Sequence, residues 1–207
     1  MKPFQFRHGT QAWPAGETLL HVYAIPDLDR DQELAELAAG CRSALAGHPL
    51  TFVQDRWLHI TIMQIADRYG AQVPPAERAH LAAALTRRLA TVPPFTLTVG
   101  SCLAQTSVVM FDVHPDDEIG RLGAAVHEAV GAVRGPEALR YHAGIPHMTI
   151  GYANGEADNA DIQRDLRRVR PSHAPMTIDR VHLVDVAVDA TAKTVTWSPI
   201  AEIPLGG

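Results

Sequence analysis

The amino-acid sequence predicts an α+β fold made of two related lobes. The same four-residue pattern, His-x-Thr-x, occurs at residues 59–62 and again at residues 147–150. In each half of the chain a strand-like run ends near a Pro-Asp pair, and a helix-like run and then this pattern follow. The interval from that proline to the histidine is 33 residues in one half (59 − 26) and 32 in the other (147 − 115). Matching intervals that end in the same pattern favour an internal duplication.

The first half of the chain predicts an arm, three strands and two helices. Residues 1–17 lack a regular pattern, and we expect an irregular N-terminal arm there. An apolar stripe at helical spacing predicts a helix at residues 29–46, and Pro74-Pro75 opens a second helix that ends near residue 90. Runs with strand character lie at residues 18–25, 50–53 and 58–63, and the last of them carries the first His-x-Thr pattern.

The second half predicts a similar alternation of elements. Pro93-Pro94 is the expected join between the lobes, near residues 91–95, so residues 18–207 form a single bilobal domain. Helices are expected at residues 115–133 and 158–168, and residues 135–144 are expected to form a loop. The predicted strands lie at residues 95–102, 107–113, 146–151, 176–188 and 194–200.

Composition narrows the class of protein. With 207 residues, 46% hydrophobic and 20% charged, the chain is typical of a soluble globular protein. A formal charge of −5 argues against an extended nucleic-acid duplex as partner, since such binding depends on a broad basic surface. No apolar run reaches membrane-spanning length, and Cys41 and Cys102 have no metal or redox spacing. We therefore expect a cytoplasmic monomer with reduced thiols and no membrane partner.

The two His-x-Thr patterns predict a phosphate site. In a strand, residues two apart share a face, so each histidine lies beside its threonine while the intervening residues point into the core. The imidazole and the hydroxyl are then roughly 6–7 Å apart along the backbone, a span that one phosphate group can touch. Two such strands facing each other would surround one phosphorus with a base, an acid and two hydroxyl donors.

Other chemistries lack their motifs in this chain. No His-Glu-x-x-His or Cys-x-x-Cys pattern indicates a metal site, and no Gly-x-Ser-x-Gly indicates a serine hydrolase. Neither a P-loop nor a dinucleotide-binding glycine pattern is present. The paired histidines therefore remain the strongest functional signal, and the chemistry they suggest needs no metal.

The paired motifs resemble those of the two-histidine (2H) phosphoesterase superfamily, which includes proteins called 2′-5′ RNA ligases and cyclic phosphodiesterases. Residues 145–152 are similar to the second motif of bacterial members, and residues 20–26 resemble their opening strand. The resemblance spans about residues 18–200. It implies a bilobal α+β fold in which two antiparallel sheets, flanked by helices, place the motifs across a central cleft.

The resemblance also implies metal-independent hydrolysis of 2′,3′-cyclic phosphates on nucleotides or RNA ends, without a cofactor. Carried over onto this chain, it makes His59 and His147 the acid–base pair and leaves open which is the base. Thr61 and Thr149 would hold phosphate oxygens.

Three aromatic residues are candidates for stacking a base: Tyr23, Trp57 and Tyr152. Trp57 is the favoured one, because a strand extended back to it would place it on the face of His59. The opposite parity of Tyr152 favours packing in the core.

Other functions use the same residues. One is a 2′-5′ RNA ligase, or a phosphodiesterase that acts on 2′-5′ oligonucleotides or cyclic dinucleotides. Another is a nucleotide-binding module without catalysis. A purely structural protein would instead keep the two motifs far apart or buried.

Overall fold

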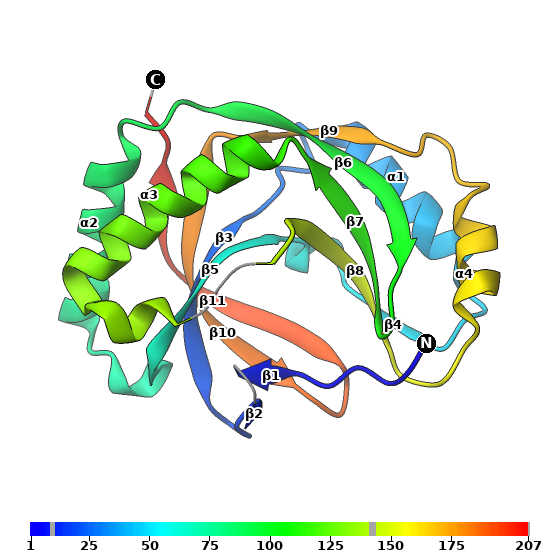
Figure 1. The fold of residues 1–207 in the computed structure, drawn as a ribbon, viewed down its shortest axis with the longest axis horizontal. Coiled ribbons are helices and arrows are strands. Elements are labelled where there is room, and N and C mark those ends of the chain that lie inside the picture. The colour runs from blue at the N-terminus through cyan, green and yellow to red at the C-terminus, as the bar shows by residue number, and fades with distance from the viewer. Residues whose placement is uncertain (9–10, 141–143, 207) are drawn as a thin grey trace.

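The computed structural model describes residues 1–8, 11–140 and 144–206. In this part of the chain nine antiparallel strands form one strongly curled sheet (Figure 1). One half of the sheet has the order β11 (Thr194–Pro204), β10 (Arg180–Asp189), β3 (Thr18–Ala24) and β5 (Ile60–Tyr69). The other half continues with β8 (His147–Ala153), β7 (Val108–His114), β6 (Phe95–Ala104) and β9 (Ala174–Ile178), while β4 (Leu50–Phe52) pairs with β8.

The predicted α+β class is confirmed, and the two expected sheets are joined into one. The junction is between the two strands that carry the His-x-Thr motifs, β5 and β8, which pair through Ile60 and Met148. A single paired position at the junction lets the two halves of the sheet splay apart on either side of it. The two motifs are therefore neighbours at the centre of the molecule.

Four helices in the described chain cover the sheet, two over each half (Figure 1). α2 (Pro75–Leu89) packs on α3 (Asp116–Arg134), and these contact β11 and β5. α1 (Gln32–Ala44) and α4 (Asn159–Leu166) contact β9 and β6. Each lobe therefore contains elements from both halves of the sequence. Residues 91–95 separate the two halves of the sequence, but they are not the boundary between the two lobes.

Hydrophobic periodicity explains the helices. Leu34, Leu37, Ala38 and Cys41 form the buried stripe of α1, as their spacing predicts. In α3 the buried stripe includes Ile119, Leu122, Val126 and Val130, and the acidic residues at positions 116–118 lie in the first turn, where the helix dipole favours them.

The expected strand at residues 176–188 is wrong, because it is two strands in different lobes. β9 pairs with β6, whereas β10 pairs with β3 and β11. Asp179 lies between them and forms ion pairs with Arg30 at 2.8 Å and with Arg180 at 3.1 Å. The chain crosses between lobes at this point, which an uninterrupted run of alternating residues does not reveal.

The N-terminal arm is not wholly irregular. Its residues 7–8 (β1, Arg7–His8) and 11–12 (β2, Gln11–Ala12) form a short hairpin. Elsewhere in the described chain there are three short 3-10 helices, at Asp55–Trp57, Gly70–Gln72 and Pro136–Leu139. The last of these lies in the expected loop at 135–144, of which residues 141–143 are outside the described residues. In the described chain, no helix is both long and apolar enough to cross a membrane.

Candidate active site

The apolar residues of both motifs point into the core, as predicted. Ile60, Met148 and Ile150 are fully buried and Ile62 is 5% exposed. His147 begins β8, whereas His59 lies one residue before β5, at the end of the turn that follows the first 3-10 helix. Burial of the alternate residues therefore anchors each motif from behind.

The two histidines and two threonines meet in one cavity. His59, Thr61, His147 and Thr149 all line a cavity of about 280 Å³ between the lobes. Since Ile60 pairs with Met148 in antiparallel register, His59 lies on the side of Thr149, and Thr61 on the side of His147. Thr61 and His147 also line an adjoining cavity of about 270 Å³ beside α3. The four side chains thus lie together at the centre of the cleft.

A β-bulge occurs at the fourth residue of each motif. Along β3 from Val22 to Tyr23 the partner on β5 changes from Met63 to Thr61, so Ile62 is an extra residue. Along β7 from Val109 to Met110 the partner on β8 changes from Gly151 to Thr149, so Ile150 is the extra residue.

These bulges reverse the side-chain alternation beyond each motif. Gln64 and Tyr152, each five residues after the motif histidine, therefore face the cleft with the threonines, and both line the cavity. Tyr152 forms a hydrogen bond with Thr149, while burial raises the pKa of the tyrosine. The alternation of an undisturbed strand had predicted the opposite face for Tyr152.

Both histidines are held in the same way. The Nδ1 atom of His59 donates to the carbonyl oxygen of Trp57 at 2.9 Å, and Nδ1 of His147 donates to that of Ile145 at 2.9 Å. A carbonyl only accepts, so Nδ1 carries the proton in each neutral ring and Nε2 carries the lone pair. Each imidazole can therefore exchange a proton with a ligand through Nε2.

Aromatic rings enclose His59. Tyr23 stacks on it with centroids 4.0 Å apart, and Trp197 meets it edge-on at 5.2 Å. Burial lowers the pKa of His59 to about 4; the hydrogen bond to Trp57 opposes part of this shift, and the nearby charge of His147 adds a smaller downward effect. His59 is therefore neutral at pH 7.

A third histidine lies behind the site. Nδ1 of His21 and the hydroxyl of Tyr23 are hydrogen-bonded at 2.7 Å, and Nε2 of His21 is buried with no hydrogen-bond partner among the described residues. Burial lowers the pKa of His21 to about 3, with smaller effects from the charges of His59 and His8. Through Tyr23, His21 supports the ring against which His59 packs.

The lining of the cleft suits an anion. Arg7 is the one permanently charged side chain among the described residues that line it, and no carboxylate is among them. Val108, Val186, Val188 and Val195 supply apolar walls. A negatively charged group with an apolar neighbour fits this combination.

The predicted aromatic residues have other contacts. Tyr23 is 2% exposed and packs on His59, so the expectation that it stacks on a base is corrected: it has no free face for one. Tyr152 is 6% exposed because Phe4 and Phe6 of the arm pack on it; it is buried as expected, but on the cleft face rather than the predicted core face. Trp57 lies in a 3-10 helix rather than a strand and packs on Trp197, so the premise for its role is wrong.

Pattern reasoning missed several residues of the cleft. Phe4, Phe6, Arg7 and Trp13 line it from the N-terminal arm, where no periodicity marks them. His21 and Gln64 are ordinary strand residues in the sequence. The position five residues after each motif histidine, Gln64 or Tyr152, could have been assigned to the cleft only if the bulge had been known.

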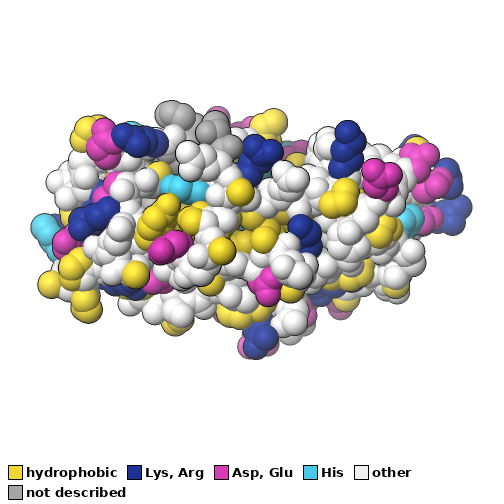
Figure 2. Space-filling model, turned by 90° about the horizontal axis from the view of Figure 1, so that it is seen from below, with side chains coloured by type: hydrophobic (Ala, Val, Ile, Leu, Met, Phe, Trp, Pro, Cys, Tyr) yellow, Lys and Arg dark blue, Asp and Glu magenta, His cyan; other side chains and the backbone are white. Residues whose placement is uncertain are grey.

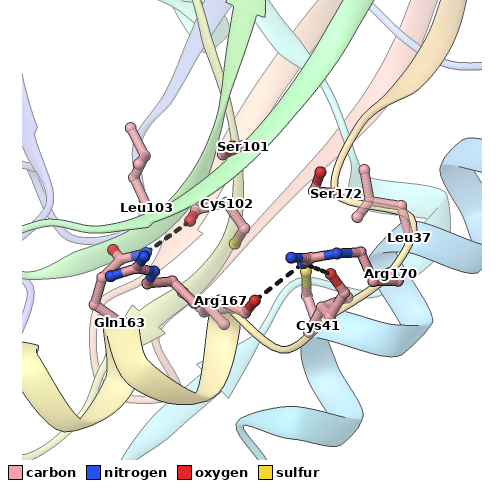
Figure 3. Close-up of a pocket in the computed structure, with 11 residues that line it drawn as sticks. Leu37, Cys41, Ser101, Cys102, Leu103, Gln163, Arg167, Arg170 and Ser172 are labelled. Atoms are coloured by element: carbon pink, nitrogen blue, oxygen red, sulfur yellow. Dashed lines mark hydrogen bonds between the residues drawn. The ribbon is translucent and has the colours of Figure 1, made fainter.

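A separate cavity of about 360 Å³ lies among α1, α4 and β6 (Figure 3). Cys41 and Cys102 line it as free, buried thiols. Arg170 also faces it but donates to the carbonyl oxygens of Arg167 and Val169. Within the described chain, no three His, Cys, Asp or Glu side chains gather as a metal site requires.

Comparison with known proteins gives one family. A sequence profile of the 2′-5′ RNA ligase superfamily matches residues 26–190. The comparison with curated proteins found no match. Among solved structures, TT0787 of Thermus thermophilus is similar with a TM-score of 0.66 and 16% identity, over 91% of this chain and 98% of that one. E. coli LigT in complex with 3′-AMP is similar with a TM-score of 0.61 and 16% identity, over 92% and 99% of the two chains. At these identities the structures show a shared fold.

Proposed function

The chain belongs to the 2′-5′ RNA ligase superfamily of two-histidine phosphoesterases, and from this we propose that it hydrolyses 2′,3′-cyclic phosphates on nucleotides or RNA ends. The observation that carries the proposal is the pair of identically anchored imidazoles, each beside a threonine, in one cleft. E. coli LigT binds 3′-AMP, a nucleotide with a 3′-phosphate, within the same fold. A 3′-phosphate is one product that opening a cyclic phosphate gives.

His59 is the general base in this proposal, and His147 is the general acid. Neutral His59 carries a lone pair on Nε2 and takes a proton from the attacking water. The water oxygen bonds to phosphorus and the bond to one ribose oxygen breaks. His147, protonated, gives the proton on Nε2 to that leaving oxygen. Thr61 and Thr149 donate hydrogen bonds to the non-bridging oxygens, where negative charge accumulates.

The unequal surroundings of the two rings support this assignment. His59 is enclosed by Tyr23 and Trp197, which disfavour its charged form. The hydrogen bond that holds His147 lies in an exposed part of the site, so this ring is open to water.

The test is a substrate panel with product mapping. The purified protein is incubated with 2′,3′-cyclic mononucleotides, cyclic dinucleotides and 2′-5′-linked oligonucleotides, and the products are assigned as 2′- or 3′-phosphates. We expect turnover of the cyclic mononucleotides and its loss in His59→Ala and His147→Ala, with the fold unchanged by circular dichroism. Full activity in either variant overturns the proposal.

The second candidate function is 2′-5′ ligation, which the family description favours. Ligation is the same step with an RNA 5′-hydroxyl in place of water: its oxygen bonds to phosphorus, the bond to the 3′-oxygen breaks, and a 2′-5′ linkage forms. Joining of RNA ends in the same panel, without hydrolysis of cyclic mononucleotides, would favour it. Nucleotide binding without any turnover would instead identify a binding module.

A further inference from the structure

The N-terminal arm docks onto the two residues that the bulges turn into the cleft. Phe4 and Phe6 pack on Tyr152 with ring centroids 4.8 Å and 5.0 Å away. On the other lobe, Nε2 of Gln64 donates to Nδ1 of His8 at 3.0 Å. The arm therefore contacts the same position after each motif, one in each lobe.

Backbone hydrogen bonds fix the arm at its start. The amide of Lys2 donates to the carbonyl of Thr106 at 2.7 Å, and that of Phe4 donates to Ala153, the last residue of β8, at 2.8 Å. From there the arm crosses the lower edge of the molecule to β1 (Figure 1). It bridges the lobes across one end of the cleft.

The arm also changes the chemistry of the cleft. Phe4, Phe6 and Trp13 add aromatic surface, and Arg7 adds the permanent positive charge noted above. The lower face, which includes the arm, shows hydrophobic side chains in its middle with charged ones scattered around them (Figure 2). An aromatic wall beside a cation fits a base and its phosphate.

We propose that the described part of the N-terminal arm, residues 1–8 and 11–17, forms a substrate-selecting cap: it closes one end of the cleft, restricts the cleft to a single nucleotide, and supplies Arg7 to the phosphate. The cavity of about 280 Å³ is near the lower limit for ligand pockets, about 300 Å³, which suits one nucleotide better than a chain. This inference rests on the proposed function.

The charge is tested with Arg7→Gln, and Lys2→Gln is the matched control. Lys2 is exposed on the same arm, and its backbone, rather than its side chain, makes the docking bond. Binding of a 3′-phosphate mononucleotide is measured by calorimetry, and KM for a 2′,3′-cyclic mononucleotide by assay. Arg7→Gln should raise the dissociation constant and KM about tenfold each, the effect of losing one charge-assisted hydrogen bond. Lys2→Gln should leave both constants unchanged. Equal effects of the two substitutions overturn the role of Arg7.

Closure of the cleft by the arm is tested with the double variant Phe4→Ala, Phe6→Ala. Phe95→Ala is the control, because it removes an apolar side chain from another part of the protein. We compare kcat/KM for a cyclic mononucleotide with that for a tetranucleotide ending in a 2′,3′-cyclic phosphate. The preference for the mononucleotide should fall several-fold when the arm is released. If the double variant is unfolded, His8→Ala is used instead; it removes the bond to Gln64 and the ring contacts with Trp13 and Tyr69 but keeps both phenylalanines. An unchanged preference in a folded variant overturns the cap.

The two proposals fail in distinguishable ways. If the unaltered protein turns over no cyclic phosphate, the proposed function fails. The calorimetric comparison of Arg7→Gln with Lys2→Gln still decides whether the arm supplies a phosphate contact.

Discussion

At the scale of single residues, the site depends on hydrogen bonds that leave one atom of each side chain free. Nδ1 of both histidines is bound to a backbone carbonyl, which leaves Nε2 as the atom that can exchange a proton. The threonine hydroxyls complete the arrangement in the proposed reaction, because a phosphate oxygen needs donors that are already oriented.

Thr61→Val tests this role of the hydroxyl. Valine keeps the shape and removes the donor, so kcat/KM for a cyclic mononucleotide should fall about 10- to 100-fold, the usual effect of losing a hydrogen bond to a charged group. Thr98→Val is the control, because Thr98 is exposed on β6, outside the cleft lining. Equal activities of the two variants would show that Thr61 holds no phosphate oxygen.

The two histidines with lowered pKa values predict how stability depends on pH. The folded-state pKa values of His21 and His59 are lowered to about 3 and about 4, from 6.5 in the unfolded chain. Their neutral forms therefore stabilise the fold fully above pH 6.5, and this stability is lost as pH falls toward those lower values.

His21→Gln should reduce this loss. Between pH 7 and about pH 4.5, the decrease in the free energy of unfolding should be smaller by about 2 kcal/mol than in the unaltered protein, as measured by urea unfolding at both pH values. His127→Gln, at an exposed position on α3, should leave the decrease unchanged. The same decrease in all three proteins would contradict a buried, neutral His21.

At the scale of elements, an ion-pair cluster ties α3 to the strand that carries the first motif. Arg134, at the end of α3, has a side chain 2% exposed and pairs with Asp67 of β5 and Glu77 of α2. Arg134→Met should lower the free energy of unfolding by about 2–4 kcal/mol, because it leaves the largely buried Asp67 carboxylate with only the 3.7 Å ion pair to the exposed Arg68. Arg121→Met, which breaks an exposed pair on the same helix, should cost less than about 1 kcal/mol. Chemical unfolding of both variants checks this, and similar losses would refute it.

The elements also show how far sequence reasoning reaches. Apolar spacing correctly predicts α1 and α3, and alternation correctly predicts that Ile60 and Met148 are buried. The bulges at Ile62 and Ile150 are invisible in that pattern, because the extra residue is defined only by the partner strand. The crossing at Asp179 is likewise set by a distant residue, Arg30.

At the scale of the whole molecule, the two motifs become one site through pairing between lobes. Sequence spacing predicts the motif pair, and the family resemblance predicts that the pair shares a cleft. The arm could not be placed in this way, because its contacts with Tyr152 and Gln64 join segments far apart in the chain.

The central claim, that both histidines act on one phosphate, is tested most directly by comparing His59→Ala, His147→Ala and the double variant in kcat for a 2′,3′-cyclic mononucleotide. In each single variant kcat should fall about 10²–10⁴-fold. In the double variant kcat should be little lower than in the less active single variant, because an acid and a base that serve one step act as a unit. Losses that multiply in the double variant, or full activity in either single variant, would contradict the account.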